Sequence, residues 1–139
     1  MIYKAIKYIL ENNAAFAAAI GTDSDSDVKI YPIHPRKEVT LPFCAFNITD
    51  QRGNPTKDAA SALDEVRVRV TIFHTNLDTL VDISDKARTA LDGEKAGGTY
   101  NAEVIASLDF ESLNDGFNET YGDRGAYYIE HDYIIWSEP

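Results

Sequence analysis

The chain has 139 residues, enough to bury about two thirds of its unfolded surface, so it can fold as one domain without a metal or a disulfide. Its 23 acidic residues against 13 basic ones give a formal net charge of −10, which disfavours tight binding of nucleic-acid phosphates. No apolar run approaches the length of a membrane span, so no membrane partner is expected. The single cysteine, Cys44, excludes a disulfide framework and fits a reducing compartment.

A short helical region is expected at the N-terminus. Apolar residues recur at helical spacing through residues 2–10. Asn13 is suited to cap a second turn or two over residues 14–20, and Gly21 ends that segment.

Two strands are predicted next, over residues 28–31 and 43–49, each beside prolines that suit strand ends. Residues 50–63 carry turn signals without periodicity, so we expect a long exposed hairpin loop. Loops of this length are often functional. It contains the basic residues Arg52 and Lys57, and it is a candidate assembly loop in the light of the family resemblance described below.

The strongest pattern lies in residues 64–91. Apolar and polar residues first alternate, which predicts a strand with one buried face. The side chains expected in the core are Val66, Val68, Val70 and Ile72. The period then becomes that of an amphipathic helix over residues 77–91, with Thr75 and Asp78 as its start signal and Gly93 as its stop.

Two more alternating strands, residues 102–111 and 127–136, predict a C-terminal hairpin joined through residues 113–125. Each strand has one core face and one acidic face. The acidic face is expected to hold Glu103, Asp109, Glu111, Glu130 and Asp132. Like charges on neighbouring strands destabilise a sheet unless water or cations screen them, so this side should face solvent or a cationic group.

The expected element order is α-β-β-β-α-β-β. Strands joined by hairpins indicate a mainly antiparallel sheet, and the two helices should cover one of its faces. The sequence therefore predicts a single α+β, two-layer domain over residues 1–139.

No catalytic, cofactor-binding or metal site is predicted. Asp23, Asp25 and Asp27 match the opening of a calcium loop, but Val28 occupies the glycine position and His34 the final glutamate position. A solvated acidic loop is the better interpretation of this segment.

The remaining reactive side chains also have simple structural interpretations. No pair among the three histidines has the helical spacing of a zinc site, and His131 is expected to be a hydrogen-bonded core or interface residue. Cys44 is interpreted as a buried apolar thiol. The carboxylates of the hairpin lack the apolar pocket that acid–base catalysis requires.

Arg67 and Arg69 lie on the face of the central strand opposite the valines. They can pair with the acidic hairpin inside the same sheet, or across a subunit boundary in a head-to-tail assembly, and the sequence leaves both arrangements open. Phe73, Tyr128 and Trp136 on the same outer faces favour a subunit interface, because a large exposed aromatic face is a liability for a monomer.

The chain resembles the tail-completion, or tail-terminator, proteins of long-tailed bacteriophages and prophages. The resemblance rests on the order and spacing of several segments rather than on one motif. These are the N-terminal helix leading into Ala15–Gly21, then Lys29–Pro32, Leu41–Phe46, Val66–Phe73, Leu77–Leu91 and Tyr127–Trp136.

The resemblance implies a non-enzymatic structural protein with no cofactor. Such proteins form hexameric rings on the head-proximal end of the tail tube, stop its polymerisation and provide the surface that joins the head connector. The implied partners are other copies of the chain, the tail tube protein and a connector or neck protein, while DNA passes through without specific binding. The implied location is the host cytoplasm during assembly and then the tail or neck of the virion.

Three alternatives remain at this point. The first is another neck component, such as a head-completion protein or a head–tail joining adaptor. The second is a small acidic enzyme that uses its carboxylates, and the third is a monomeric host binding domain with solvated charges.

Overall fold

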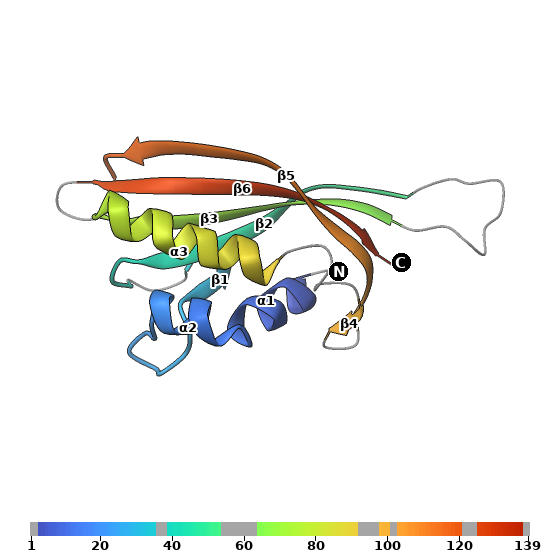
Figure 1. The fold of residues 1–139 in the computed structure, drawn as a ribbon, viewed down its shortest axis with the longest axis horizontal. Helices are drawn as coiled ribbons and strands as arrows, with labels where there is room; N and C mark the ends of the chain where they lie inside the picture. Colours follow the sequence, from blue (N-terminus) through green and yellow to red (C-terminus); the bar gives the residue numbers. More distant parts are fainter. Residues whose placement is uncertain are drawn as a thin grey trace.

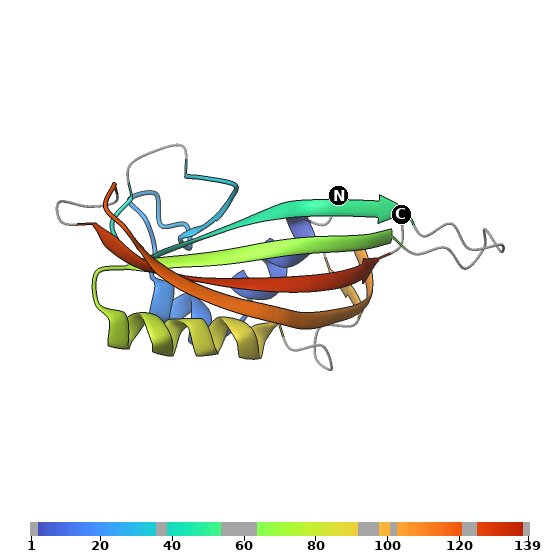
Figure 2. The same ribbon diagram turned by 90° about the horizontal axis from the view of Figure 1, so that it is seen from above.

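A computed structural model describes residues 3–35, 39–53, 64–91, 98–100, 103–120 and 125–137 as a β-sheet with helices on one face (Figure 1; Figure 2). The helices are α1 (Tyr3–Glu11), α2 (Ala14–Ile20) and α3 (Leu77–Ala90). The strands are β1 (Ile30–Pro32), β2 (Phe43–Gly53), β3 (Asp64–His74), β4 (Gly98–Tyr100), β5 (Glu103–Asn118) and β6 (Ala126–Ser137).

The strands form one six-stranded sheet in the order β1-β2-β3-β6-β5-β4. β1 runs parallel to β2, and every other neighbouring pair is antiparallel. The predicted α+β class and the mainly antiparallel sheet are therefore confirmed. The helix layer differs in detail, because the N-terminal region forms two separate helices and the layer contains three.

Asparagine side chains cap the N-termini of two of the helices. The Asn13 side chain accepts a hydrogen bond from the backbone N–H of Phe16 at 3.0 Å and starts α2, as expected. Helix α3 begins at Leu77 as predicted, but its cap is Asn76 rather than Thr75. The Asn76 side chain accepts from the backbone N–H of Thr79 at 3.1 Å. The expected stop signal at Gly93 lies outside the described residues.

The main core lies between the sheet and the helices. The alternating valines of β3 point into it, and the apolar positions of β6 face the same way. Its largest fully buried side chains include Tyr133, Phe16, Phe46, Ile6, Leu10, Ile20, Ile72 and Leu80. Burying a large apolar side chain stabilises a fold by roughly 1.5–3 kcal/mol, so this shared face fixes which side of each strand is turned outward.

β5 departs from simple alternation. Its register against β6 shifts between Ile105 and Ser107 and again between Phe110 and Ser112. Each shift marks a β-bulge, in which one extra residue reverses the alternation on one side of it. As a result Glu103 lies on the helix side of the sheet, where its carboxylate accepts a hydrogen bond from the backbone N–H of Ala5 at 3.2 Å.

The strands are also longer than predicted. Residues 113–118 continue β5, so the connection expected over residues 113–125 is shorter. Residues 50–53, at the start of the predicted 50–63 loop, belong to β2. The rest of that loop, with Lys57, lies outside the described residues.

A second, smaller core lies on the opposite face of the sheet at one end. Phe43 and Phe73 stack there with ring centroids 4.9 Å apart, and Tyr128 packs against Phe73 at 6.1 Å. Val39 and Leu41, which precede β2, pack against this cluster and cover it.

A polar group in the main core is fully satisfied by neighbouring side chains. His131 of β6 is buried, with its Nε2 atom 2.6 Å from Ser84 Oγ of α3 and its Nδ1 atom 3.0 Å from the Tyr133 hydroxyl. The interpretation of His131 as a hydrogen-bonded histidine in the core is therefore confirmed. Burial lowers the pKa of His131 to about 4, and the nearby Arg88 acts in the same direction, whereas Asp85 and Asp132 oppose it.

His131 should make the fold sensitive to mild acid. The unfolded chain binds a proton near the ordinary pKa of 6.5, but the folded chain keeps His131 neutral until about pH 4. The free energy of unfolding should therefore fall as the pH is lowered from 6.5 to 4. We expect urea unfolding across this range to show a steeper fall for the wild type than for His131→Gln, which does not titrate.

Carboxylates also titrate near pH 4, so the difference between the two proteins is the informative quantity. His34→Gln serves as the matched control, because His34 is exposed and lies outside the core, so this variant removes a histidine without touching the buried one. An identical slope for the wild type and His131→Gln would contradict this account of the buried histidine.

Candidate interaction surface

The candidate site is the sheet face that the helices leave uncovered, together with its charged side chains. The register places three successive rows of residues side by side across β2, β3, β6 and β5. The rows are Asn47–Arg69–Asp132–Ser112, Asp50–Arg67–Ile134–Asp109 and Arg52–Glu65–Trp136–Ser107. We call this set, with Glu111 and Glu130, the charged face.

Arg69 joins two carboxylates of β6. Its Nε atom lies 2.9 Å from a carboxylate oxygen of Glu130 and 2.9 Å from one of Asp132. Ser112 of β5 donates a further hydrogen bond to Asp132 at 3.2 Å. The hydrogen bond with Asp132 is the main cause that raises the pKa of Arg69, so the guanidinium stays charged.

Arg67 reaches across β6 to β5. One of its terminal nitrogens lies 2.8 Å from Glu111, and the other lies 3.3 Å from Glu65 on its own strand. The hydrogen bond to Glu111 is the main cause that raises the pKa of Arg67. Of the two arrangements left open by the sequence, the structure therefore contains the pairing within one sheet.

The charged face has more acids than bases. Its carboxylates are Asp50, Glu65, Asp109, Glu111, Glu130 and Asp132, and its bases are Arg52, Arg67 and Arg69. Because each arginine pairs with a carboxylate of the same face, the excess charge is negative. A surface of this kind repels phosphate at distances within about 10 Å at moderate salt.

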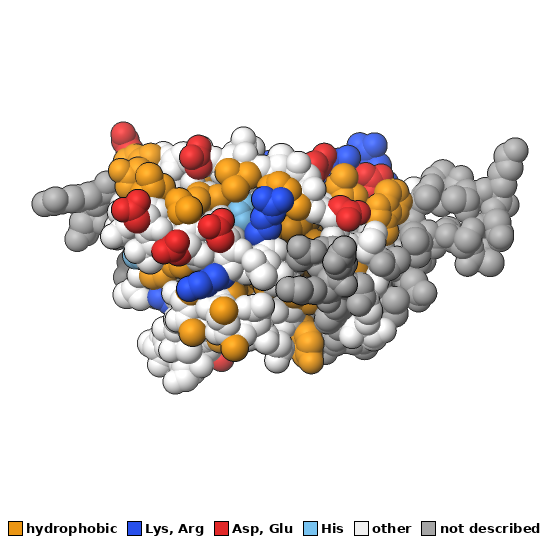
Figure 3. All heavy atoms as spheres, viewed as in Figure 1, with side chains coloured by type: hydrophobic (Ala, Val, Ile, Leu, Met, Phe, Trp, Pro, Cys, Tyr) orange, Lys and Arg blue, Asp and Glu red, His pale blue; other side chains and the backbone are white. Residues whose placement is uncertain are grey.

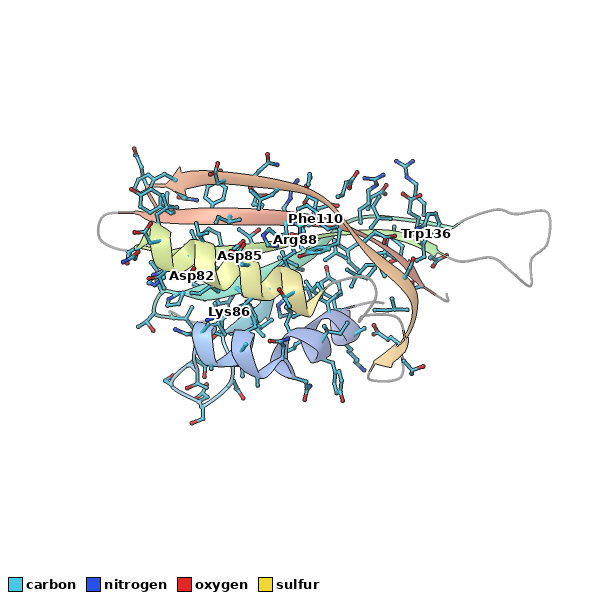
Figure 4. The ribbon with its side chains drawn as sticks, viewed as in Figure 1. Asp82, Asp85, Lys86, Arg88, Phe110 and Trp136 are labelled. Carbon is cyan, nitrogen blue, oxygen red and sulfur yellow. The ribbon has the colours of Figure 1, made fainter. Side chains whose placement is uncertain are left out.

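The structure separates the aromatic residues that were expected at an interface. Phe73 is only 9% exposed, because Phe43 and the residues that precede β2 cover it, so the expectation of an exposed Phe73 was wrong. Tyr128 is half-buried beside it. Trp136 lies at the opposite end of the charged face (Figure 4). Its side chain is partly exposed.

The predicted acidic face is also smaller than expected. Asp109, Glu111, Glu130 and Asp132 belong to the charged face, but Glu103 does not, because the bulge after Ile105 turns it toward α1. Two carboxylates of the charged face, Glu65 and Asp50, were not predicted. The sequence contained a signal for them, because a simple hairpin places both beside Arg67.

The acidic loop after α2 is closed by its own hydrogen bonds. The carboxylates of Asp23, Asp25 and Asp27 have oxygen atoms within 4.8 Å of one another. Asp23 accepts hydrogen bonds from the backbone N–H groups of Asp25 and Asp27, at 2.8 and 3.1 Å, and from the Tyr31 hydroxyl at 2.9 Å. These bonds account for the loop without an ion.

The other reactive side chains lie apart from the charged face. Cys44 is buried in the main core, and burial raises the pKa of its thiol. His74 ends β3, where partial burial lowers its pKa. Within the described residues, no helix is long and apolar enough to cross a membrane.

The ion pairs of the charged face should contribute little stability individually. Replacing Arg69 by Met leaves Glu130 and Asp132 beside each other without a cation, and we expect a loss below about 1 kcal/mol in the free energy of unfolding at low salt. The loss should shrink at about 0.5 M salt, since screening weakens the repulsion. Urea unfolding at both salt concentrations measures it.

Arg52→Met is the matched control, because the Arg52 side chain is 73% exposed and pairs with Asp50 on its own strand. This variant should unfold like the wild type at both salt concentrations. A larger loss for Arg52→Met than for Arg69→Met would contradict the assignment of the central pairs.

Comparison with known proteins shows that the fold also occurs in a solved structure. No protein-family model and no curated protein sequence matches the chain. Among solved structures, a chain in the virion of a native gene transfer agent particle is similar, with a TM-score of 0.70 and 14% sequence identity. The similarity covers 96% of this chain and 92% of the other, so the two share one fold over nearly their whole length.

Proposed function

We propose that this protein is a structural component of a phage-like virion, and more specifically a tail-completion protein that forms a ring at the head-proximal end of the tail tube. The observation that carries the proposal is the nearly end-to-end similarity to a chain of a gene transfer agent virion. A shared fold alone does not define a function. The order of sequence segments typical of tail-completion proteins supplies the second, independent support.

Those segments correspond to the elements that build the domain. They form α2, β1, the start of β2, the central strand β3, helix α3 and the last strand β6. The resemblance in sequence therefore follows the framework of the fold, and it extends over all of its layers.

The charge of the exposed sheet face is compatible with DNA passage through such a ring. A wall with more carboxylates than arginines does not hold phosphates, so a duplex can slide past it. In this proposal the ring consists of copies of this chain, contacts the tail tube protein on one side and joins a head connector or neck protein on the other. Assembly takes place in the host cytoplasm, and the protein then remains in the virion neck.

The contact between subunits is proposed at the Trp136 end of the charged face. Arg67 and Arg69 already have carboxylate partners inside the sheet, so they add little new attraction for a neighbour. Trp136 and Ile134 are partly exposed apolar side chains on the same face, and aromatic residues are enriched in protein interfaces. Tyr128 is a half-buried residue that borders this face at its other end.

A catalytic role is less well supported. The carboxylates of the charged face lie on an open sheet surface, and the closest serine–histidine contact, Ser84 to His131, is buried where no substrate reaches it. We therefore propose a protein that acts by assembly, without a cofactor or catalytic residues.

The central experiment combines the purified protein with the tail tube protein of the same phage or prophage. Electron microscopy should show a ring at one end of each tube, and the tubes should stop growing when the protein is added. Tubes that elongate equally in its presence, with no density at either end, would overturn the tail-completion role. Rings that bind an isolated head connector but never a tube would instead favour another neck component.

Trp136→Ala tests the proposed subunit contact. We expect it to reduce the fraction of capped tubes at least tenfold while the circular dichroism spectrum stays that of the wild type, because partly exposed aromatic anchors contribute strongly to interfaces. Tyr8→Ala is the control, since Tyr8 is similarly apolar, 44% exposed and on α1. Equal capping by both variants would exclude Trp136 from the contact.

A further inference from the structure

One long edge of the sheet is open. β4 pairs only with Glu103, Val104 and Ile105 of β5, so from Ser107 to Asn118 the described part of the chain places a strand on one side of β5 only. An edge strand presents a row of backbone N–H and C=O groups that can pair with another chain. Natural sheets keep such edges short or cover them, and this one extends over twelve residues.

Exposed apolar side chains gather along this edge. Five of the seven large hydrophobic residues that are exposed within the described residues belong to the end of β5, the start of β6 and the first turns of α3. They are Leu77, Val81, Leu113, Phe117 and Tyr127, and each is between 37% and 49% exposed. We call these five residues the apolar strip.

Ring packing and strand register relate the members of the strip. The rings of Phe117 and Tyr127 lie 5.2 Å apart. Leu113 pairs in register with His131, and His131 contacts Ser84 of α3, so the strand next to β5 packs on the helix. Further along, the guanidinium of Arg88 covers the Phe110 ring at 3.9 Å and ends the strip (Figure 4).

Carboxylates surround the strip. On the helix side, Asp115 of β5 and Asp78, Asp82 and Asp85 of α3 are exposed, and on the other side of the same edge Asp109 and Glu111 are exposed. Figure 3 shows hydrophobic side chains along this edge with acidic groups on both sides of them. The local charge is strongly negative, because the only bases of α3 are Lys86 and Arg88, and Arg88 is stacked on Phe110.

We propose that the β5 edge is a docking site for an extended segment of a partner protein whose apolar residues alternate with Lys or Arg. The partner strand would extend the sheet by main-chain hydrogen bonds, and its apolar side chains would cover the strip on the helix side. Its basic side chains, which the alternation of a strand turns to the other face, would meet Asp109 and Glu111. The charge complementarity argues against a second copy of this chain at the same edge, since two acidic edges would oppose each other.

This docking site shares Asp109 and Glu111 with the edge of the charged face, but it does not depend on the proposed virion role. A strand of about eight residues spans roughly 26 Å, which matches the stretch from Asp109 to Phe117. The edge would therefore accept one strand and leave the exposed sheet face free for another contact.

Peptide probes test the proposal directly. The first is a fluorescein-labelled eight-residue peptide of alternating Lys and Val. The second is the same peptide with every other backbone amide N-methylated, and the third carries Glu in place of Lys. Fluorescence anisotropy should detect binding of the first, at least tenfold weaker binding of the second and no binding of the third. Amide chemical shifts of isotope-labelled protein should change along β5.

Binding of the N-methylated peptide as tightly as the first would overturn the proposal, because the attraction would then be general electrostatics without strand pairing. Shift changes confined to β2 and β3 would overturn it as well.

Leu113→Ser combined with Phe117→Ser should weaken binding of the first peptide at least tenfold. Ile33→Ser is the control, because Ile33 is 68% exposed but lies away from this edge, and it should bind like the wild type. Should the double variant fail to fold, Asp109→Lys combined with Asp115→Lys keeps the apolar residues and should lose binding through charge alone. A dimer of the protein alone, seen by analytical ultracentrifugation and abolished by the double variant, would make a second copy the occupant and overturn the proposal.

Discussion

The pairing of β3 with β6 is the constraint on which the rest of this structure depends. Its register sets the valines of β3 and the odd-numbered residues of β6 against the helices. The same register brings Arg69 beside Asp132 on the other side. A slip by one residue would bury the arginines and expose the valines, so the hydrophobic core and the ion pairs select the same alignment. The ion pairs contribute little energy individually, but they make the alternative register much worse.

The sequence alone was sufficient where one pattern controlled the outcome. The alternation in β3 and the helical period of α3 predicted both elements to within a few residues, because burial of a single face dominates each. The buried, hydrogen-bonded His131 followed from its place among the apolar positions of the last strand. The cap of α3 was predicted less accurately, with Asn76 in place of Thr75, because both side chains are able to cap a helix.

The candidate surface was harder to predict, because it depends on contacts between distant segments. Glu103 belongs to the same alternating run as Asp109, and only the register of β5 on β6 separates them. Phe73 is covered by Leu41, some thirty residues earlier in the chain, and no local pattern reveals such a cover. The ion pair of Arg67 was also not predictable, because its partner Glu111 lies at the second bulge of β5, on the far side of β6.

The two bulges also determine how the sheet is shaped. From Ile105 to Asn118, β5 takes thirteen residue steps, while β6 covers the matching path from Ser137 to Ala126 in eleven. The edge strand β5 is thus longer than β6 over the same path, and the sheet bends there, as the curved course of β5 across β6 in Figure 1 illustrates. A homologue that lacked both extra residues would have a straighter edge, but its equivalent of Glu103 would stay on the helix side, because the two reversals of the alternation cancel. The length of β5, rather than any single side chain, would then be the feature to compare first between distant relatives.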